Sequence, residues 1–256
     1  MASSPVSMPQ TNRLGRWAAF AYGLVCYAVF LVTLLYACGF VSNIVVPRSI
    51  DSAPVLPLQH ALLVNLGLLG LFGIQHSVMA RKGFKRWWTQ FVPTAVERST
   101  YVLLSSLCLA TLFYLWQPMG GVVWRVTNPT AVAALYAISA AGWLIVLSTS
   151  FLINHFDLFG LHQVWLYLRG EEYTATPFVT PGLYQYVRHP LYVGFLLAFW
   201  ATPVMTIAHL VFSLVTAAYI LVAVQFEERD LVDTFGDDYA NYRRQVPMIV
   251  PGPRRG

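Results

Sequence analysis

The chain contains 256 residues, of which 57% are hydrophobic and only 11% are charged. Soluble domains carry about 25% charged residues, so this composition excludes a water-soluble globular domain and predicts an integral membrane protein. The formal net charge is +5, which we attribute to loops that face anionic membrane lipids rather than to a nucleic-acid-binding surface.

Four apolar runs approach or exceed the roughly 20 residues that a helix needs to cross the hydrocarbon core of a membrane. These runs are residues 17–41, 55–80, 97–116 and 130–153. The first run is too long for the core of a signal peptide, so we interpret it as an anchor helix. All three cysteines lie within the predicted spans and lack the spacing of a disulfide framework or a zinc site, so we expect no metal.

A fifth apolar block, residues 190–226, is interrupted near its middle by Thr202-Pro203. Proline breaks a helix, so we expect this block to form a hairpin of two shorter helices. The sequence therefore predicts an all-α integral membrane protein with about five to six transmembrane helices, including a C-terminal helical hairpin. It contains no glycine-rich strand–turn–helix fingerprint, so we expect no Rossmann domain.

Basic residues are distributed unevenly between the two sides of the predicted membrane. If the N-terminus faces the cytoplasm, 14 Lys and Arg residues lie on the cytoplasmic side and only Arg48 and Arg125 lie on the other. This asymmetry predicts a cytoplasmic-membrane protein with both termini in the cytoplasm. The chain is interpreted as one domain, 1–256, with five successive parts: a cytoplasmic N-terminus (1–16), four spanning helices (17–153), an interfacial helix and loop (154–189), the hairpin (190–226) and a cytoplasmic tail (227–256).

The segment that follows the fourth apolar run combines polar side chains with an amphipathic stretch. Leu161, Val164, Trp165 and Leu168 share one helical face, which predicts a helix lying in the membrane interface. The polar side chains just before this stretch are Asn154, His155 and Asp157.

Polar clusters stand at both ends of the hairpin sequence. The first contains Tyr184, Arg188, His189 and Tyr192, and the second contains Glu227 and Glu228. Pro190 suits the first position of a helix, which places Arg188 and His189 at the positive end of a helix dipole, where a carboxylate is favoured. The two glutamates have no basic residue four positions later, so they need donors from elsewhere. We therefore expect the two clusters to share one pocket.

The second helix of the hairpin is expected to extend beyond the apolar block. It should continue to Phe235 and end at Gly236, because glycine readily ends a helix. A short amphipathic helix from Asp237 to about Gln245 should follow, before Pro247.

The C-terminal third, residues 180–250, resembles the isoprenylcysteine carboxyl methyltransferase and phospholipid methyltransferase group of membrane enzymes. The matching motifs are Arg188-His189-Pro190-Leu-Tyr192-Val-Gly194, Glu227-Glu228-Arg-Asp-Leu231, Phe235-Gly236 and Val246-Pro247. The upstream half is more similar to the methanethiol S-methyltransferase branch, which is related to the NnrU proteins. The segments that carry this similarity are Gln75-His76-Ser-Val-Met-Ala-Arg81, Glu97-Arg98-Ser-Thr-Tyr-Val-Leu-Leu-Ser105 and Asn154-His-Phe-Asp-Leu-Phe-Gly160.

This resemblance implies a methyltransferase that binds S-adenosylmethionine within the membrane-embedded fold and releases S-adenosylhomocysteine. The matched positions that would contact this cofactor are Tyr184, Arg188, His189, Tyr192, Glu227 and Glu228. The expected reaction is methylation of a small thiol, namely conversion of methanethiol to dimethyl sulfide at the cytoplasmic face. The expected partners are this thiol and membrane lipids, with no nucleic acid, and the oligomeric state stays open.

Methyl transfer to sulfur needs a thiolate aligned with the methyl group, and a thiol with a pKa of about 8.5 is only slightly ionised at neutral pH. A nearby base or cation should therefore accelerate the reaction. The candidates near the cytoplasmic ends of the predicted spans are His76, Asp157, Asn154, His155 and Arg98. A histidine oriented by a carboxylate would act as the base, Asn154 would donate a further hydrogen bond, and Arg98 would supply positive potential. We favour His76 and Asp157 over His155, which lies two positions from Asp157 and points elsewhere in a helix.

Other interpretations of the same residues stay open. His76 is also suited to the headgroup region, and Asn154, His155 and Asp157 are also suited to capping the interfacial helix, with Asp157 as its N-cap. Methylation of an isoprenylcysteine carboxylate or of a phospholipid amine is the alternative enzymatic function. A membrane transporter or proton relay using His60, His76 and Asp157 is the alternative outside enzymes.

Overall fold

The computed structural model describes residues 13–174 and 177–252. Most of the predicted cytoplasmic N-terminus, 1–16, and the last four residues of the predicted tail lie outside the described residues. Within these described residues, five helices are long and apolar enough to cross a membrane. They are α1 (Arg13–Ser42), α2 (Leu58–Ala80), α4 (Thr94–Leu115), α5 (Pro129–Leu152) and α9 (Ile207–Phe235). The shorter apolar helix α8 (Pro190–Trp200) completes the hairpin with α9. The predicted all-α membrane fold is therefore confirmed.

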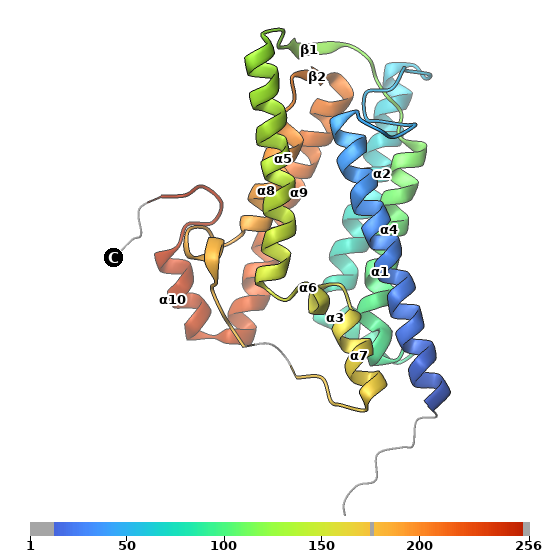
Figure 1. Ribbon diagram of the computed structural model, residues 1–256, viewed down its shortest axis with the longest axis vertical. Coiled ribbons are helices and arrows are strands. Elements are labelled where there is room, and N and C mark those ends of the chain that lie inside the picture. Colours follow the sequence, from blue (N-terminus) through green and yellow to red (C-terminus); the bar gives the residue numbers. More distant parts are fainter. Residues whose placement is uncertain (1–12, 175–176, 253–256) are drawn as a thin grey trace, which may run out of the picture.

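The long helices form two groups that lie side by side in Figure 1. In the first group α4 packs against both α1 and α2, and in the second group α8 packs against both α5 and α9. The two groups meet where α2 contacts α9. The polar residues of the hairpin ends therefore lie in a group of helices that also borders α2.

Short elements gather at the two ends of the helix groups. At one end, β1 (Val122–Arg125) pairs in antiparallel fashion with β2 (Val204–Thr206), a small sheet that the sequence did not predict. At the other end lie the remaining short elements (Figure 1). They are α3 (Lys82–Trp88), α6 (His155–Leu158), α7 (Leu161–Arg169), the 3₁₀ turn η1 (Gly182–Gln185) and α10 (Asp237–Gln245).

The hairpin is broken where the sequence predicts. Helix α8 ends at Trp200 and α9 begins at Ile207, with the Thr206 side chain accepting a hydrogen bond from the backbone N–H of His209. Helix α9 then continues for 29 residues to Phe235. Gly236 ends it with φ +57°, a backbone angle that glycine adopts without the steric cost that other residues bear.

Helix α8 is held tightly against α5 by two glycines. A Cβ atom on Gly142 would lie 2.6 Å from the carbonyl oxygen of Gly194, and a Cβ atom on Gly194 would lie 2.7 Å from the carbonyl oxygen of Gly142. Ser139 adds a hydrogen bond across the pair, because its hydroxyl donates to the carbonyl of Ala198 at 3.1 Å. Close backbone approach through small residues is how helices gain packing energy in lipid, where the hydrophobic effect between them is absent.

The predicted interfacial helix forms over the expected residues, as α7. It packs against α1 through Val164, which is fully buried next to Gly23. Its N-cap is Gly160, with φ +89°, so the interpretation of Asp157 as the N-cap is wrong. Asp157 instead lies inside the single turn α6, whose N-cap Asn154 accepts a hydrogen bond from the backbone N–H of Asp157.

Candidate functional site

The two polar clusters at the ends of the hairpin meet, as the sequence predicts. The Arg188 Nε atom donates to the Glu228 Oε1 atom at 2.7 Å, and the His189 Nε2 atom lies 3.1 Å from the same oxygen. All three side chains are almost completely buried: 11% of the Arg188 side chain, 4% of His189 and 8% of Glu228 are exposed. The three side chains therefore form a closed network rather than an open surface.

The C-terminal segment of the chain closes one side of this network. The Arg188 Nη1 atom donates to the carbonyls of Arg243 and Val246, at 2.8 and 2.6 Å. The backbone N–H groups of Arg188 and His189 donate to the carbonyls of Pro247 and Met248. A buried guanidinium needs such acceptors for each of its N–H groups, since unpaired charge in the interior is costly. Arg188 thus fastens the segment after α10 to the start of α8.

Glu227 differs from Glu228 in exposure, although the two residues are neighbours on α9. Successive residues of a helix point about 100° apart, so only one of them enters the closed network. The side chain of Glu227 is 44% exposed, and its Oε2 atom accepts a hydrogen bond from the Tyr192 hydroxyl at 2.9 Å. The His189 Nδ1 atom lies 3.8 Å from the same oxygen. The site therefore offers a half-exposed carboxylate held in place by an aromatic hydroxyl.

Tyr184 lies next to this carboxylate, in the 3₁₀ turn that leads to α8. Burial, and after it the negative charge of Glu227, raises the pKa of Tyr184. Burial also raises the pKa of Tyr242 to about 12, and the Tyr242 hydroxyl donates to the Tyr184 carbonyl at 2.6 Å. Both phenols are therefore neutral at pH 7, and Tyr242 ties α10 to the turn that carries Tyr184.

His76 occupies a second polar cluster, formed by α2 and α4. Its Nδ1 atom lies 3.2 Å from the Ser105 hydroxyl, and the Tyr101 hydroxyl lies 3.0 Å from both of its ring nitrogens. Phe72 stacks on the imidazole ring, with 5.2 Å between ring centroids. The guanidinium of Arg98 lies over the Tyr101 ring at 5.0 Å. His76 is thus held between α2 and α4 by side chains of both helices.

Tyrosine hydroxyls connect the His76 cluster with the hairpin. The Tyr219 hydroxyl on α9 lies 3.1 Å from the Ser77 hydroxyl on α2. The Tyr219 ring also lies 6.4 Å from the ring of Phe72, which stacks on His76. Neither Tyr101 nor Tyr219 was among the residues selected from the sequence, although Tyr101 stands in the segment that begins Glu97-Arg98. Tyr101 reaches His76, and Tyr219 reaches Ser77, through contacts between helices that are distant along the chain.

Asp157 contacts neither His76 nor His155. The sequence predicts that one of these histidines pairs with Asp157, and this prediction is wrong because the histidine beside Asp157 is His162. The Asp157 Oδ1 atom instead lies 3.1 Å from both the His162 Nδ1 atom and the Gln163 Nε2 atom, and its Oδ2 atom accepts from the Tyr173 hydroxyl at 2.9 Å. His162 stands five positions after Asp157, where the start of α7 turns it back toward α6. This carboxylate thus links α6, α7 and the following loop.

Asp157 and Arg98 line one polar pocket of about 340 Å³ at the end of the molecule that carries α3 and α7. The Arg98 Nε atom donates to the Leu158 carbonyl at 2.8 Å, which ties α4 to α6. The lining residues are Lys85, Thr94, Glu97, Arg98, Ile153, Asp157, Leu158, Gln163 and Tyr173. Arg98 and Asp157, two of the five predicted catalytic residues, therefore line the same pocket. His76 does not line it and is separated from Arg98 by the Tyr101 side chain.

His155 points away from this pocket. Its ring is 2% exposed, with the Ser150 hydroxyl 2.8 Å from its Nδ1 atom and the Tyr27 hydroxyl 2.7 Å from its Nε2 atom. Burial lowers the pKa of His155. It is therefore neutral at pH 7 and fastens α6 to α1 and α5, in agreement with the expectation that it points elsewhere than Asp157.

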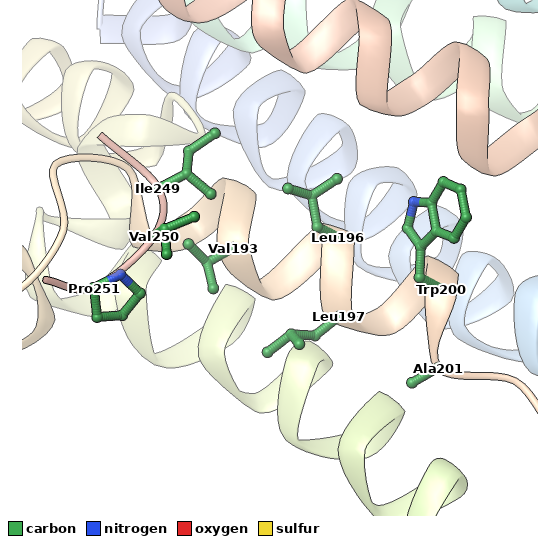
Figure 2. A pocket seen from close by; sticks show the side chains of 8 residues that line it. All are labelled: Val193, Leu196, Leu197, Trp200, Ala201, Ile249, Val250 and Pro251. Atoms are coloured by element: carbon green, nitrogen blue, oxygen red, sulfur yellow. The ribbon is translucent and has the colours of Figure 1, made fainter. Parts of the chain in front are cut away.

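An apolar groove runs along α8 next to the hairpin site. It has a volume of about 600 Å³, and Figure 2 shows its side chains coming from α8 and from the C-terminal segment. These side chains are Val193, Leu196, Leu197, Trp200, Ala201, Ile249, Val250 and Pro251. Val193 directly follows Tyr192, so the groove begins beside the residue that holds Glu227.

Comparison with known proteins gives a consistent result. The phospholipid methyltransferase family matches residues 136–238, which include all of α8 and α9. A methanethiol S-methyltransferase of Crocosphaera subtropica is 56% identical, and the match covers 93% of each chain. One from Mycobacterium tuberculosis is 53% identical, over 94% of this chain and 98% of the relative. The chain belongs to the methanethiol S-methyltransferase family. No solved structure matches.

Membership in this family makes the protein a membrane methyltransferase. The matched range 136–238 contains Arg188, His189, Glu227 and Glu228 but not His76. The methanethiol S-methyltransferase relatives match along almost the whole chain, so their similarity also includes the α2–α4 cluster. The sequence similarity to the narrower family thus extends over both clusters, whereas the match to the broader family begins after the α2–α4 cluster.

Proposed function

We propose that this protein methylates a small thiol, converting methanethiol to dimethyl sulfide with S-adenosylmethionine as the methyl donor. Relatives that carry the name methanethiol S-methyltransferase match this chain over almost its entire length. The observation that carries the proposal is the position of the half-exposed Glu227 carboxylate. It lies next to the closed Arg188–Glu228 network, where the Tyr192 hydroxyl donates to it and His189 is 3.8 Å away.

The residues around Glu227 fit this donor chemically. S-adenosylmethionine carries a positive sulfonium and a positive ammonium group, which a half-exposed carboxylate attracts. The faces of Tyr192 and Tyr184 add a cation–π contribution of about 1 kcal/mol. In this proposal Glu227, Tyr184 and Tyr192 hold the donor, while Arg188, His189 and Glu228 shape the site and fasten the C-terminal segment. The donor supplies a methyl group bound to positively charged sulfur.

His76 is the proposed proton acceptor for the thiol. It lies next to Tyr101 between α2 and α4, and a neutral imidazole has one ring nitrogen that can accept a proton. Arg98 supplies positive potential through its position over the Tyr101 ring. Asn154, His155 and Asp157 act by holding α6 in place against α1, α5 and α7, since their polar atoms are engaged with neighbouring residues.

We place this reaction at the cytoplasmic face of the cytoplasmic membrane, with both termini in the cytoplasm. The site lies at the end of the molecule that carries α3, α7 and α10 (Figure 1). The distribution of 14 basic residues against two supports this orientation. The donor then enters from water, and the volatile, apolar thiol enters from the lipid.

The proposal is tested by incubating purified protein in detergent with methanethiol and S-adenosylmethionine and measuring dimethyl sulfide in the headspace. Dimethyl sulfide should form in proportion to the protein added. Formation of no methylated thiol, in a preparation that binds the donor, would contradict the assignment of the substrate.

The apolar groove along α8 favours one second candidate, a substrate with a long hydrocarbon chain. Its 600 Å³ would accommodate part of a prenyl or acyl chain along α8. Methyl transfer to a prenylated cysteine carboxylate or to a phospholipid amine, measured in the same preparation, distinguishes the candidates. Activity on these substrates and not on methanethiol would replace the thiol as the acceptor.

A further inference from the structure

The polar pocket that Arg98 and Asp157 line is a cavity separate from the hairpin site. Its volume is about 340 Å³, and its lining comes from α3, the first turns of α4, the end of α5, α6, α7 and the loop after α7. None of the described residues that line it belongs to the α8–α9 hairpin. Ligand pockets usually measure about 300–1,000 Å³, so this cavity is large enough for a small polar molecule.

Two residues that line the polar pocket carry a buried oxygen atom without a hydrogen-bond donor. These atoms are the Oε1 atoms of Glu97 and Gln163, and neither has a partner among the described residues. The Gln163 Nε2 atom donates to the Asp157 carbonyl and carboxylate, so Oε1 is the atom of this amide that is left over. A buried acceptor without a donor is unfavourable. A ligand with several N–H donors, such as an ammonium group, would satisfy both oxygens.

Two positively charged side chains line the same pocket. Lys85 comes from α3, and Arg98 comes from α4 and uses its Nε atom to bind the Leu158 carbonyl. Within the part of the chain that the structure describes, neither side chain forms an ion pair with a carboxylate. Burial, and after it the positive charge of Arg98, lowers the pKa of Lys85. A bound anion would offset both effects, so this side of the pocket favours a negatively charged group.

Helix α4 begins at the wall of the polar pocket. Thr94, its first residue, lines the pocket, and the preceding Pro93 provides no side-chain cap for the helix. The first turn of a helix has backbone N–H groups without an intrahelical partner and carries a partial positive charge, which favours an anion. The start of this 22-residue helix therefore adds to the positive potential of Lys85 and Arg98.

We propose that the polar pocket binds a small zwitterion, a molecule with an ammonium group and a carboxylate or phosphate group, separately from the methyl donor. The ammonium group donates to the oxygens of Glu97 and Gln163, and the anionic group lies against Lys85, Arg98 and the start of α4. A lone anion would leave the Glu97 oxygen without a donor, and a lone cation would leave two positive side chains without an acceptor. The inference does not depend on the reaction proposed for the hairpin site.

This ligand chemistry has two sources, the aqueous phase and the membrane. A free amino acid carries an ammonium and a carboxylate group, and the headgroup of an ethanolamine phospholipid carries an ammonium and a phosphate group. Trp87 on α3 and Trp165 on α7 are exposed, as is typical of side chains at a membrane interface. The pocket therefore lies at a depth where both sources are present. A choline headgroup has no N–H donor, which makes it the chemical control for the lipid.

The experiment measures binding by calorimetry to the full-length protein in detergent, after removal of copurified lipid. The first arm titrates O-phosphoethanolamine and L-leucine, each against ethanolamine and inorganic phosphate, which carry only one of the two charges. The second arm compares dihexanoyl phosphatidylethanolamine with dihexanoyl phosphatidylcholine. A zwitterion with N–H donors should bind at least about tenfold more tightly than its control, because charged hydrogen bonds are lost in the control. Tight binding in the first arm indicates an aqueous ligand, and tight binding in the second arm alone indicates a lipid.

Lys85→Gln and Glu97→Gln test whether the zwitterion binds in this pocket. Each change removes one charge and keeps a polar side chain, and each should weaken binding of the tightest probe by at least about tenfold. The matched controls are Lys82→Gln and Glu171→Gln, which remove the same charges from exposed residues that do not line the pocket. Both controls should bind the probe as tightly as the wild-type protein.

Melting temperatures separate a binding role of Lys85 and Glu97 from a structural one. Without a probe, their Gln variants should melt close to the wild-type protein, because neither side chain has an ion-pair partner among the described residues. The tightest probe should raise the melting temperature of the wild-type protein and not that of the two variants. A lower melting temperature in the variants with unchanged probe binding would show a structural role and overturn the proposal.

The affinity of the same variants for S-adenosylmethionine tests whether the two sites are separate. It should stay within about twofold of the wild-type value in Lys85→Gln and Glu97→Gln. Loss of donor affinity in both variants would mean that the polar pocket holds part of the donor, and would overturn a separate site. Failure of every zwitterion to bind better than its control would overturn the proposal as a whole. The headspace assay for dimethyl sulfide reports independently on the proposed function.

Discussion

The hairpin of α8 and α9 carries a buried histidine–carboxylate pair at each of its ends. At one end His189 lies 3.1 Å from Glu228, which Arg188 also binds. At the other end the His209 Nδ1 atom lies 3.6 Å from Asp51, which accepts a hydrogen bond from the Thr206 hydroxyl. His189 and His209 are 4% and 0% exposed. By burial and residue type alone, the two ends look alike.

The surroundings separate the two ends. The first pair borders Glu227, whose carboxylate is half-exposed, and Tyr192. The second pair is enclosed by backbone and core, with the His209 Nε2 atom 2.8 Å from the Phe199 carbonyl and Phe212 nearby in the aromatic core. The buried histidine–carboxylate pair therefore has a structural role at both ends of the hairpin. The exposed carboxylate beside it is what makes one end a candidate binding site.

The largest effect is expected from Glu228→Ala. This change leaves the buried guanidinium of Arg188 without its carboxylate, and breaking one partner of a buried pair costs about 3–5 kcal/mol. The melting temperature in detergent should fall strongly. Glu227→Ala is the matched control and should lower it little, because that side chain is half-exposed. Equal melting temperatures in the two variants would contradict the assignment of Glu228 as the fastening residue.

A smaller effect is expected at the opposite end of the hairpin. Asp51→Asn keeps the shape of the side chain and removes the negative charge that faces His209, so unfolding should become easier by about 1–3 kcal/mol. The affinity for S-adenosylmethionine should not change, because Asp51 lies at the other end of α9. A large loss of donor affinity in this variant would mean that the two ends are not functionally distinct.

The smallest effect concerns His155, a buried histidine whose ring nitrogens face hydroxyls rather than a carboxylate. Burial lowers the pKa of His155, so the folded state resists its protonation. Its contribution to stability is fully present above the unfolded pKa of about 6.5 and is lost as the pH falls below that value. The melting temperature of the wild-type protein should drop more between pH 7.5 and pH 5 than that of His155→Gln. If the melting temperatures of the wild-type protein and His155→Gln fall equally between pH 7.5 and pH 5, His155 makes no such contribution.

The sequence alone predicts most of the fold, because its signals are local. Apolar runs of sufficient length locate the spanning helices, Pro203 locates the break in the hairpin, and Gly236 locates the end of α9. The pairing of β1 with β2 was not predicted, since the two strands are short and about 80 residues apart. Such pairings depend on how the helix groups pack.

The candidate site is only partly predictable for the same reason. The meeting of Arg188 with Glu228 follows from their places at two ends of one hairpin. The predicted partner of Asp157 was wrong, because the turn at Gly160 brings His162 back toward α6. Tyr101 was missed, because only the packing of α4 against α2 shows that it contacts His76.

The most direct test of the central claim is a calorimetric titration of S-adenosylmethionine into the wild-type protein, Glu227→Gln and Asp51→Asn. Loss of a charged hydrogen-bonding partner costs about 1.5–3 kcal/mol, so Glu227→Gln should weaken binding by at least about tenfold without lowering the melting temperature. Asp51→Asn should bind the donor as tightly as the wild-type protein. Equal affinity in the wild-type protein and Glu227→Gln would show that the half-exposed carboxylate is not where the donor binds.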